Sequence, residues 1–229
     1  MPVRAAVRGL TAVALLLGYG AAAACSGDSA VPTAPSPGLD GARPAASPTA
    51  TGSTTPGVGL TVVPRSDGSF DMTEDLRLSA ATDVLQLQLP ASGAQLPGLM
   101  SPTNPQVTNL NVIADDQSVP LTETTLDGPD YIPLIAAATR IRLTYRLSGS
   151  AVLATPSRSP RAGAVVRPLT ASADGSLPTD VTVTTGLLNA VCPLLPEPRC
   201  AVGDPPHLAI EPGIPAGKAL VVLQLDLPR

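Results

Sequence analysis

The chain holds a single histidine, His207, and this residue limits the catalytic chemistry that the sequence can support. Asp204 lies three residues before it and could orient the imidazole as a general base. No G-x-S-x-G motif supplies a serine nucleophile, however, and one histidine cannot build a multi-histidine metal site. We therefore expect no catalytic residues. A loop histidine is the simpler interpretation, and a small hydrolase that uses His207 is the alternative.

Three cysteines, Cys25, Cys192 and Cys200, are the other candidates for covalent chemistry. If Cys25 is modified, Cys192 and Cys200 remain to pair in an oxidising compartment, and the loop-entropy model gives the ring that they close a stabilisation of about 2.6 kcal/mol. A metal site formed by these two cysteines and His207 is the alternative, but it lacks a fourth ligand and a C-x-x-C spacing. The sequence therefore predicts a disulfide, with no metal site and no cofactor.

Arg140, Arg142 and Arg146 alternate with apolar residues and so fall on one face of a predicted strand. Such a row could bind an anionic partner, for example a cell-wall polymer or a lipid headgroup. The alternative is a solvated outer face on which Glu74, Asp75 and other acids balance the arginines.

The N-terminus has the three parts of an export signal: the basic residues Arg4 and Arg8, an apolar stretch over 10–17, and small residues that end at Ala24. The apolar stretch is short for a spanning helix, which needs about 20 residues. The sequence Ala22-Ala23-Ala24-Cys25 resembles a bacterial lipobox, with Ala22 where leucine is most usual. The resemblance implies a bacterial lipoprotein that is cut before Cys25 and carries a diacylglyceryl group on that thiol. An ordinary secretory signal or an uncleaved anchor is the alternative.

Residues 25–58 are predicted to form a disordered tether behind the signal peptide of residues 1–24. Of the 33 residues 26–58, 27 are Ala, Gly, Pro, Ser or Thr, so few side chains can offset the entropy of folding. Fully extended, the tether would reach about 100 Å. Lys218 is the only lysine of the chain, and its other basic residues, His207 apart, are all arginine. Together with the excess of alanine and proline, this composition resembles the coding bias of high-GC actinobacteria. Lipid and tether together predict a location on the extracytoplasmic face of the cell membrane.

Residues 59–229 are predicted to form one all-β module, an antiparallel β-sandwich that follows the signal peptide and linker. Apolar and polar residues alternate as expected of strands with one buried face. The predicted strands are 58–63, 70–78, 85–89, 107–113, 119–125, 141–147, 151–155, 164–169, 181–183 and 221–227. Turns are expected at 66–69, 115–116, 127–129 and 174–176, and short helical turns at 132–138 and 186–191. An immunoglobulin-like sandwich and a small barrel both remain open.

The composition of the chain excludes one class of function and leaves three hypotheses. Aromatic residues are 2% of the chain and the net charge is -4, which argues against a nucleic-acid binder. The first hypothesis is a non-catalytic binding or envelope-interaction module, whose partner is an envelope protein or a cell-wall component. The second is a carrier that holds an apolar ligand, such as a lipid, in an aliphatic cavity. The third is the hydrolase that uses His207.

Overall fold

A computed structural model describes residues 55–154 and 160–229 of the chain. The predicted signal peptide, Cys25 and nearly all of the tether lie outside the described residues. The first strand, β1 (Gly57–Pro64), begins two residues before the predicted start of the folded module. Residues 57 and 58 therefore belong to a strand and not to the tether. Within the described residues, no helix is long and apolar enough to span a membrane.

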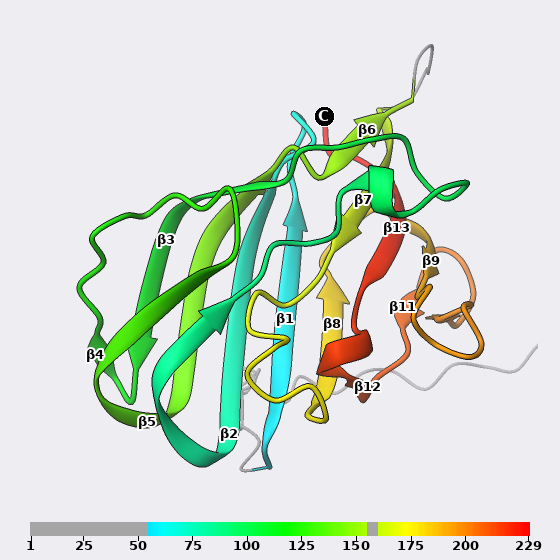
Figure 1. Cartoon of the computed structure of the whole chain (residues 1–229). Helices are drawn as coiled ribbons and strands as arrows, with labels where there is room; N and C mark the ends of the chain where they lie inside the picture. Colours follow the sequence, from blue (N-terminus) through cyan, green and yellow to red (C-terminus); the bar gives the residue numbers. More distant parts are fainter. Residues whose placement is uncertain (1–54, 155–159) are drawn as a thin grey trace, which may run out of the picture. The chain divides into compact units, whose positions relative to one another are not determined.

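The larger sheet has seven strands in the order β12-β8-β1-β2-β5-β3-β4 (Figure 1). Besides β1, these are β2 (Phe70–Leu87), β3 (Gln106–Ala114), β4 (Gln117–Ser118), β5 (Asp130–Ser148), β8 (Pro178–Val183) and β12 (Ile214–Pro215). All neighbours in this sheet are antiparallel except β1 and β8, which run parallel. The predicted antiparallel pattern is thus confirmed for most of the sheet.

The second sheet has four antiparallel strands in the order β6-β7-β13-β9. They are β6 (Ala151–Leu153), β7 (Arg161–Val166), β13 (Val221–Asp226) and β9 (Leu187–Val191). A small ribbon joins β10 (Ala201–Val202) to β11 (Ala209–Ile210), and η1 (Gly93–Gln95) and η2 (Ala216–Lys218) are single 3-10 turns. The described residues contain no α-helix, so the all-β prediction is confirmed.

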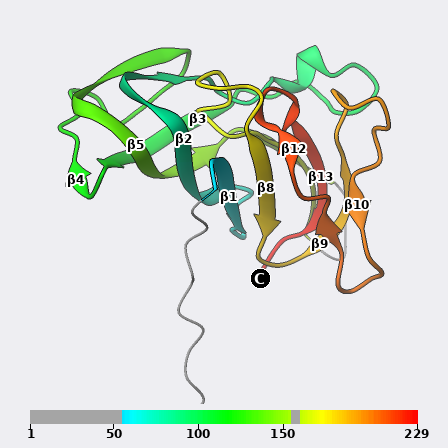
Figure 2. The same cartoon turned by 90° about the horizontal axis from the view of Figure 1, so that it is seen from below.

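One aliphatic core lies between the two sheets. It joins inward side chains of the larger sheet, such as Leu60 and Leu143, to Leu223 and Leu225 of β13. Figures 1 and 2 show β8 of the larger sheet beside β13 of the second. This arrangement is the predicted sandwich, although its sheets hold seven and four strands where an immunoglobulin constant-type domain has four and three.

The strands β2 and β5 are longer than predicted and curl back over the core (Figure 1). Their register shifts between Arg77 and Val84, and beyond the shift 82–87 of β2 pair with 130–138 of β5. We call these two paired segments, 82–87 of β2 and 130–138 of β5, the curled ribbon. The predicted helical turn at 132–138 is therefore wrong, because Ile132 and Leu134 alternate with exposed neighbours and cover the core as strand residues.

Two further predictions of local structure are wrong. Residues 186–191 do not form a helical turn, since 187–191 are the strand β9 and pair with β13. The predicted strand at 119–125 is mostly irregular, because only its first residue, Val119, is buried. The turn at Asp115-Asp116 is confirmed as the hairpin between β3 and β4, and both residues have positive φ values, as a tight hairpin turn requires.

Candidate functional site

Arg140, Arg142 and Arg146 lie together on the outer face of β5, as predicted, because alternate residues of a strand share a face. Register places an aspartate of β2 opposite two of them, and the third reaches the β3–β4 turn. The ion pairs are Arg142–Asp75 at 2.6 Å, Arg146–Asp71 at 3.1 Å and Arg140–Asp116 at 2.8 Å. The hydrogen bond from Arg142 to Asp75 raises the pKa of this arginine. The face is charge-balanced, and binding of an anion there stays a prediction.

Glu74 does not take part in this balance, contrary to the expectation from sequence. It lies between Met72 and Leu76 in the inward register of β2, and its side chain is completely buried. Its carboxylate accepts hydrogen bonds from the backbone N–H of Leu169 at 2.8 Å and of Thr170 at 3.1 Å, and from the Thr170 hydroxyl. The sequence contained the signal, since the same alternation that buries Met72 and Leu76 places Glu74 inward.

The surroundings of Glu74 shift the pKa of its carboxyl group. Burial raises its pKa, and the donors from Thr170 and Leu169 oppose that shift only in part. Tyr145 lies in the same buried region, and burial together with the neighbouring carboxylate raises the pKa of its phenol well above the usual value. Residues 167–177 form the crossover segment that leads from β7 to β8. Glu74 fixes this segment to β2 through its hydrogen bonds with Leu169 and Thr170, and we interpret it as a structural group.

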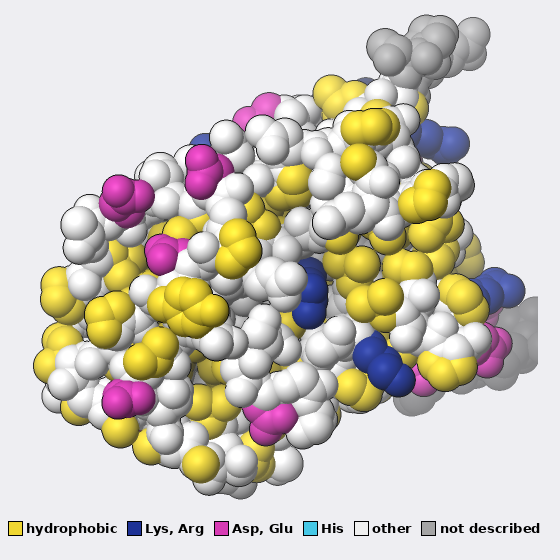
Figure 3. All heavy atoms as spheres, in the orientation of Figure 1, with side chains coloured by type: hydrophobic (Ala, Val, Ile, Leu, Met, Phe, Trp, Pro, Cys, Tyr) yellow, Lys and Arg dark blue, Asp and Glu magenta, His cyan; other side chains and the backbone are white. Residues whose placement is uncertain are grey.

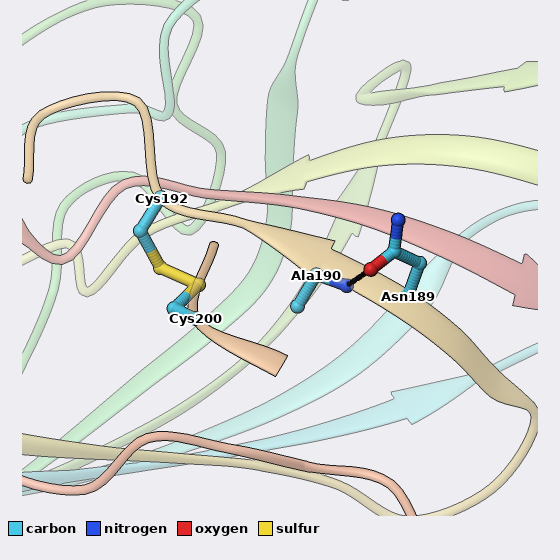
Figure 4. The surroundings of a disulfide bond; sticks show 4 residues. All are labelled: Asn189, Ala190, Cys192 and Cys200. Carbon is cyan, nitrogen blue, oxygen red and sulfur yellow. Dashed lines mark hydrogen bonds between the residues drawn. A yellow bond between two sulfur atoms is a disulfide. The ribbon is translucent and has the colours of Figure 1, made fainter. Parts of the chain in front are cut away.

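Cys192 and Cys200 form a disulfide, as predicted, and both residues are fully buried (Figure 4). Cys192 directly follows the strand β9, and Cys200 stands directly before β10. The backbone N–H of Cys192 donates to the carbonyl of Pro198, which closes the loop beside the disulfide. With both thiols joined, neither cysteine can act as a nucleophile, and the described residues hold no cluster of three or more metal-ligating side chains.

His207 lies exposed in the loop between β10 and β11. Its backbone N–H donates to the carbonyl of Asp204 at 2.8 Å, so the two residues are joined through the main chain. No hydrogen bond joins its imidazole to any other residue of the described part of the chain. A serine or cysteine in hydrogen-bond reach, which the hydrolase hypothesis requires, is therefore not present among the described residues.

Two hollows bear on the carrier hypothesis. One of about 410 Å³ lies where β2 bends toward the crossover segment, and mostly small side chains line it, with Ala80, Ala81 and Ala173 among them. The other, of about 180 Å³, lies between β8 and the residues around Ile210. Both are open at the surface and neither lies within the aliphatic core, whereas a carrier would enclose its ligand in an apolar cavity.

The outward side of the curled ribbon carries large apolar side chains that the fold leaves exposed. Val84 is 43% exposed, Tyr131 63% and Ile135 65%. Val84 pairs with Pro133, and Tyr131 and Ile135 lie two residues to either side of that proline on the same face. We call these four side chains the ribbon face, and Figure 3 shows hydrophobic side chains gathered on this part of the surface. Sequence reasoning missed it, because the segment was predicted as a helical turn.

Comparison with known proteins adds little to this description. No protein-family model matches the chain, and no curated protein does. Among solved structures, an aminopeptidase N family protein from Idiomarina loihiensis is similar with a TM-score of 0.43 and 10% sequence identity. The match covers 74% of this chain and 29% of that one, so the chain spans less than a third of its length. A likeness of this size carries no argument about activity.

Proposed function

We propose that the chain is a non-catalytic binding module, held on the extracytoplasmic face of the cell membrane by a lipid on Cys25, that docks an envelope protein on its ribbon face. The observation that carries the proposal is the exposure of Val84, Tyr131 and Ile135 side by side on the curled ribbon. Exposed apolar side chains that gather on one face are typical of protein-interaction sites.

The contrast between two faces of the molecule supports this choice of surface. On the outer face of the larger sheet, the arginines of β5 are matched by aspartates, so this face is well hydrated and needs no partner. The apolar side chains of the ribbon face, by contrast, are exposed to water without a covering partner in the described part of the chain. Tyrosine is enriched among the residues that dominate binding energy at interfaces, and Tyr131 exposes 63% of its surface on this face.

The anchor and the tether fit the same function. A diacylglyceryl group on Cys25, together with a further acyl chain, would give stable membrane attachment where a single chain gives only marginal binding. A tether that can extend about 100 Å would let the module reach partners at varying distances from the membrane. The module would then search for a partner without leaving the membrane.

Site-specific photo-crosslinking in intact cells tests the proposal. A photo-reactive amino acid replaces Tyr131 in one variant and Asn111 in the control, which is exposed on the outer face of the larger sheet. We expect one discrete protein adduct from position 131 and none from position 111. No adduct at position 131, with lipid extracted from the purified chain, would reject the proposal in favour of the carrier.

A further inference from the structure

Arg167 stands directly after β7, at the start of the crossover segment. β7 and β13 pair up to the residue before it, and this register places Arg167 beside Leu220. It shares a strand face with Val165, whose side chain packs in a small apolar cluster with Leu96, Leu220 and Val222. The guanidinium therefore emerges at the edge of an apolar cluster, where its charge is only partly hydrated.

No carboxylate among the described residues forms an ion pair with Arg167. Its Nε atom is closed off from solvent and has no hydrogen-bond partner among the described residues, and no ion pair joins this side chain to a carboxylate there. Burial lowers the pKa of Arg167. The more exposed arginines of β5, such as Arg142, each have an aspartate partner. Arg77 also lacks an ion pair among the described residues, but none of its nitrogens is sealed off without a partner.

A second cation lies at the same end of the β7–β13 pair. Lys218 ends η2, two residues before Leu220, and no ion pair in the described part of the chain involves it. η2 is joined to the crossover segment, since the N–H of Gly217 donates to the carbonyl of Gly175 at 2.9 Å. Figure 3 shows basic side chains over these two segments, with apolar side chains beside them.

We propose that Arg167 binds a phosphate group, with Lys218 as a second contact. The Nη atoms of Arg167 are not sealed off as its Nε is, so they can donate two parallel hydrogen bonds to phosphate oxygens. The bound phosphate supplies the counter-charge that no carboxylate of the described residues gives this half-buried guanidinium, and an unpaired charge that loses part of its hydration is costly. The phosphate is either a free ion or the headgroup of an anionic lipid. The site is independent of the ribbon face and stands if that face binds nothing.

Titration calorimetry with inorganic phosphate tests the site in the full-length chain with Cys25→Ala, which removes the lipid. We expect saturable binding at one site, a loss of affinity of about tenfold or more for Arg167→Gln, and a smaller loss for Lys218→Gln. Arg142→Gln is the matched control and should bind as the parent does, because Asp75 already occupies that guanidinium. If Arg167→Gln fails to fold, Arg167→Lys should fold and bind with intermediate affinity. The proposal would be overturned if the parent does not bind phosphate, or if the parent and Arg167→Gln bind it with equal affinity.

Flotation with phosphatidylglycerol vesicles separates the two sources of phosphate. Parent and Arg167→Gln are compared in the same Cys25→Ala background, so any membrane affinity of the N-terminal residues cancels. A lipid headgroup would be identified by two results together: Arg167→Gln floats less than the parent, and excess inorganic phosphate lowers the flotation of the parent. Equal flotation together with phosphate binding by calorimetry would identify a free phosphate ion.

Discussion

Replacing Glu74 with alanine should destabilise the fold far more than any exposed acid does. The change removes the acceptor of two buried backbone N–H groups, those of Leu169 and Thr170. Each buried donor without a partner costs about 1–3 kcal/mol, which gives about 2–6 kcal/mol for the two. Removing a buried carboxylate that lost its hydration on folding offsets part of this cost. We therefore expect the free energy of unfolding to fall by about 3 kcal/mol.

Denaturant unfolding of the full chain measures this loss, and Asp75→Ala is the matched control. Asp75 is the next residue of β2, but its side chain is half exposed and paired with Arg142 across the outer face. Exposed ion pairs contribute about 0.2–1 kcal/mol, so Asp75→Ala should cost no more than that. Hydrogen exchange adds a local readout, because the amides of Leu169 and Thr170 should lose protection in Glu74→Ala and keep it in Asp75→Ala.

Equal costs for the two alanine variants would refute the reasoning. So would unchanged exchange at Leu169 and Thr170, because it would mean that the crossover segment is held without the carboxylate. Glu74→Gln separates charge from hydrogen bonding. It keeps one carbonyl acceptor and should lie between the parent and Glu74→Ala.

Three other predictions concern pH, backbone strain and the disulfide. The raised pKa of Glu74 means that the folded state holds the proton of this carboxyl group more tightly than the unfolded state does. The free energy of unfolding of the parent should therefore fall relative to that of Glu74→Gln as pH rises from 4.5 through the folded pKa. Parallel curves of stability against pH for the two proteins would argue against this. Gly186→Ala should cost about 2–4 kcal/mol in denaturant unfolding, because φ is +74° and the new Cβ would lie 2.0 Å from the Asp226 carbonyl oxygen. Gly98→Ala, at φ +80° in open space, should cost only about 1–2 kcal/mol, and equal costs would show that the close approach is unimportant. Reduction of the disulfide should lower stability by about 2–3 kcal/mol, and an unchanged thermal midpoint would contradict this.

The sequence predicted the strands whose alternation is regular. β1, β3 and the second half of β5 follow the pattern of buried and exposed residues almost throughout. The first half of β5 was missed because Ala136, Ala137 and Ala138 resemble a helix-forming run, whereas 130–133 and Ala138 pair with β2 and extend the strand through this segment. Propensity was overridden here by a partner strand that lies far away in sequence.

The candidate sites show the same division between local and distant information. Cys192 and Cys200 could be paired from sequence because the lipobox resemblance leaves only these two cysteines free. The partners of Glu74 lie 95 and 96 residues away, so no local pattern names them. The exposure of Tyr131 and Ile135 depends on which side of the curled ribbon faces the core, and this follows only from the bend in β2 and β5.

Protein docking on the ribbon face is tested most directly by a second substitution in the crosslinking strain. With the photo-reactive residue at position 131, Ile135→Asp places a charge on the apolar ribbon face, whereas Asn111→Asp places the same charge on the outer face of the larger sheet. The proposal predicts that Ile135→Asp lowers the yield of the adduct about tenfold and that Asn111→Asp leaves it unchanged. An adduct that persists with Ile135→Asp, or that both substitutions weaken equally, would contradict docking at this face.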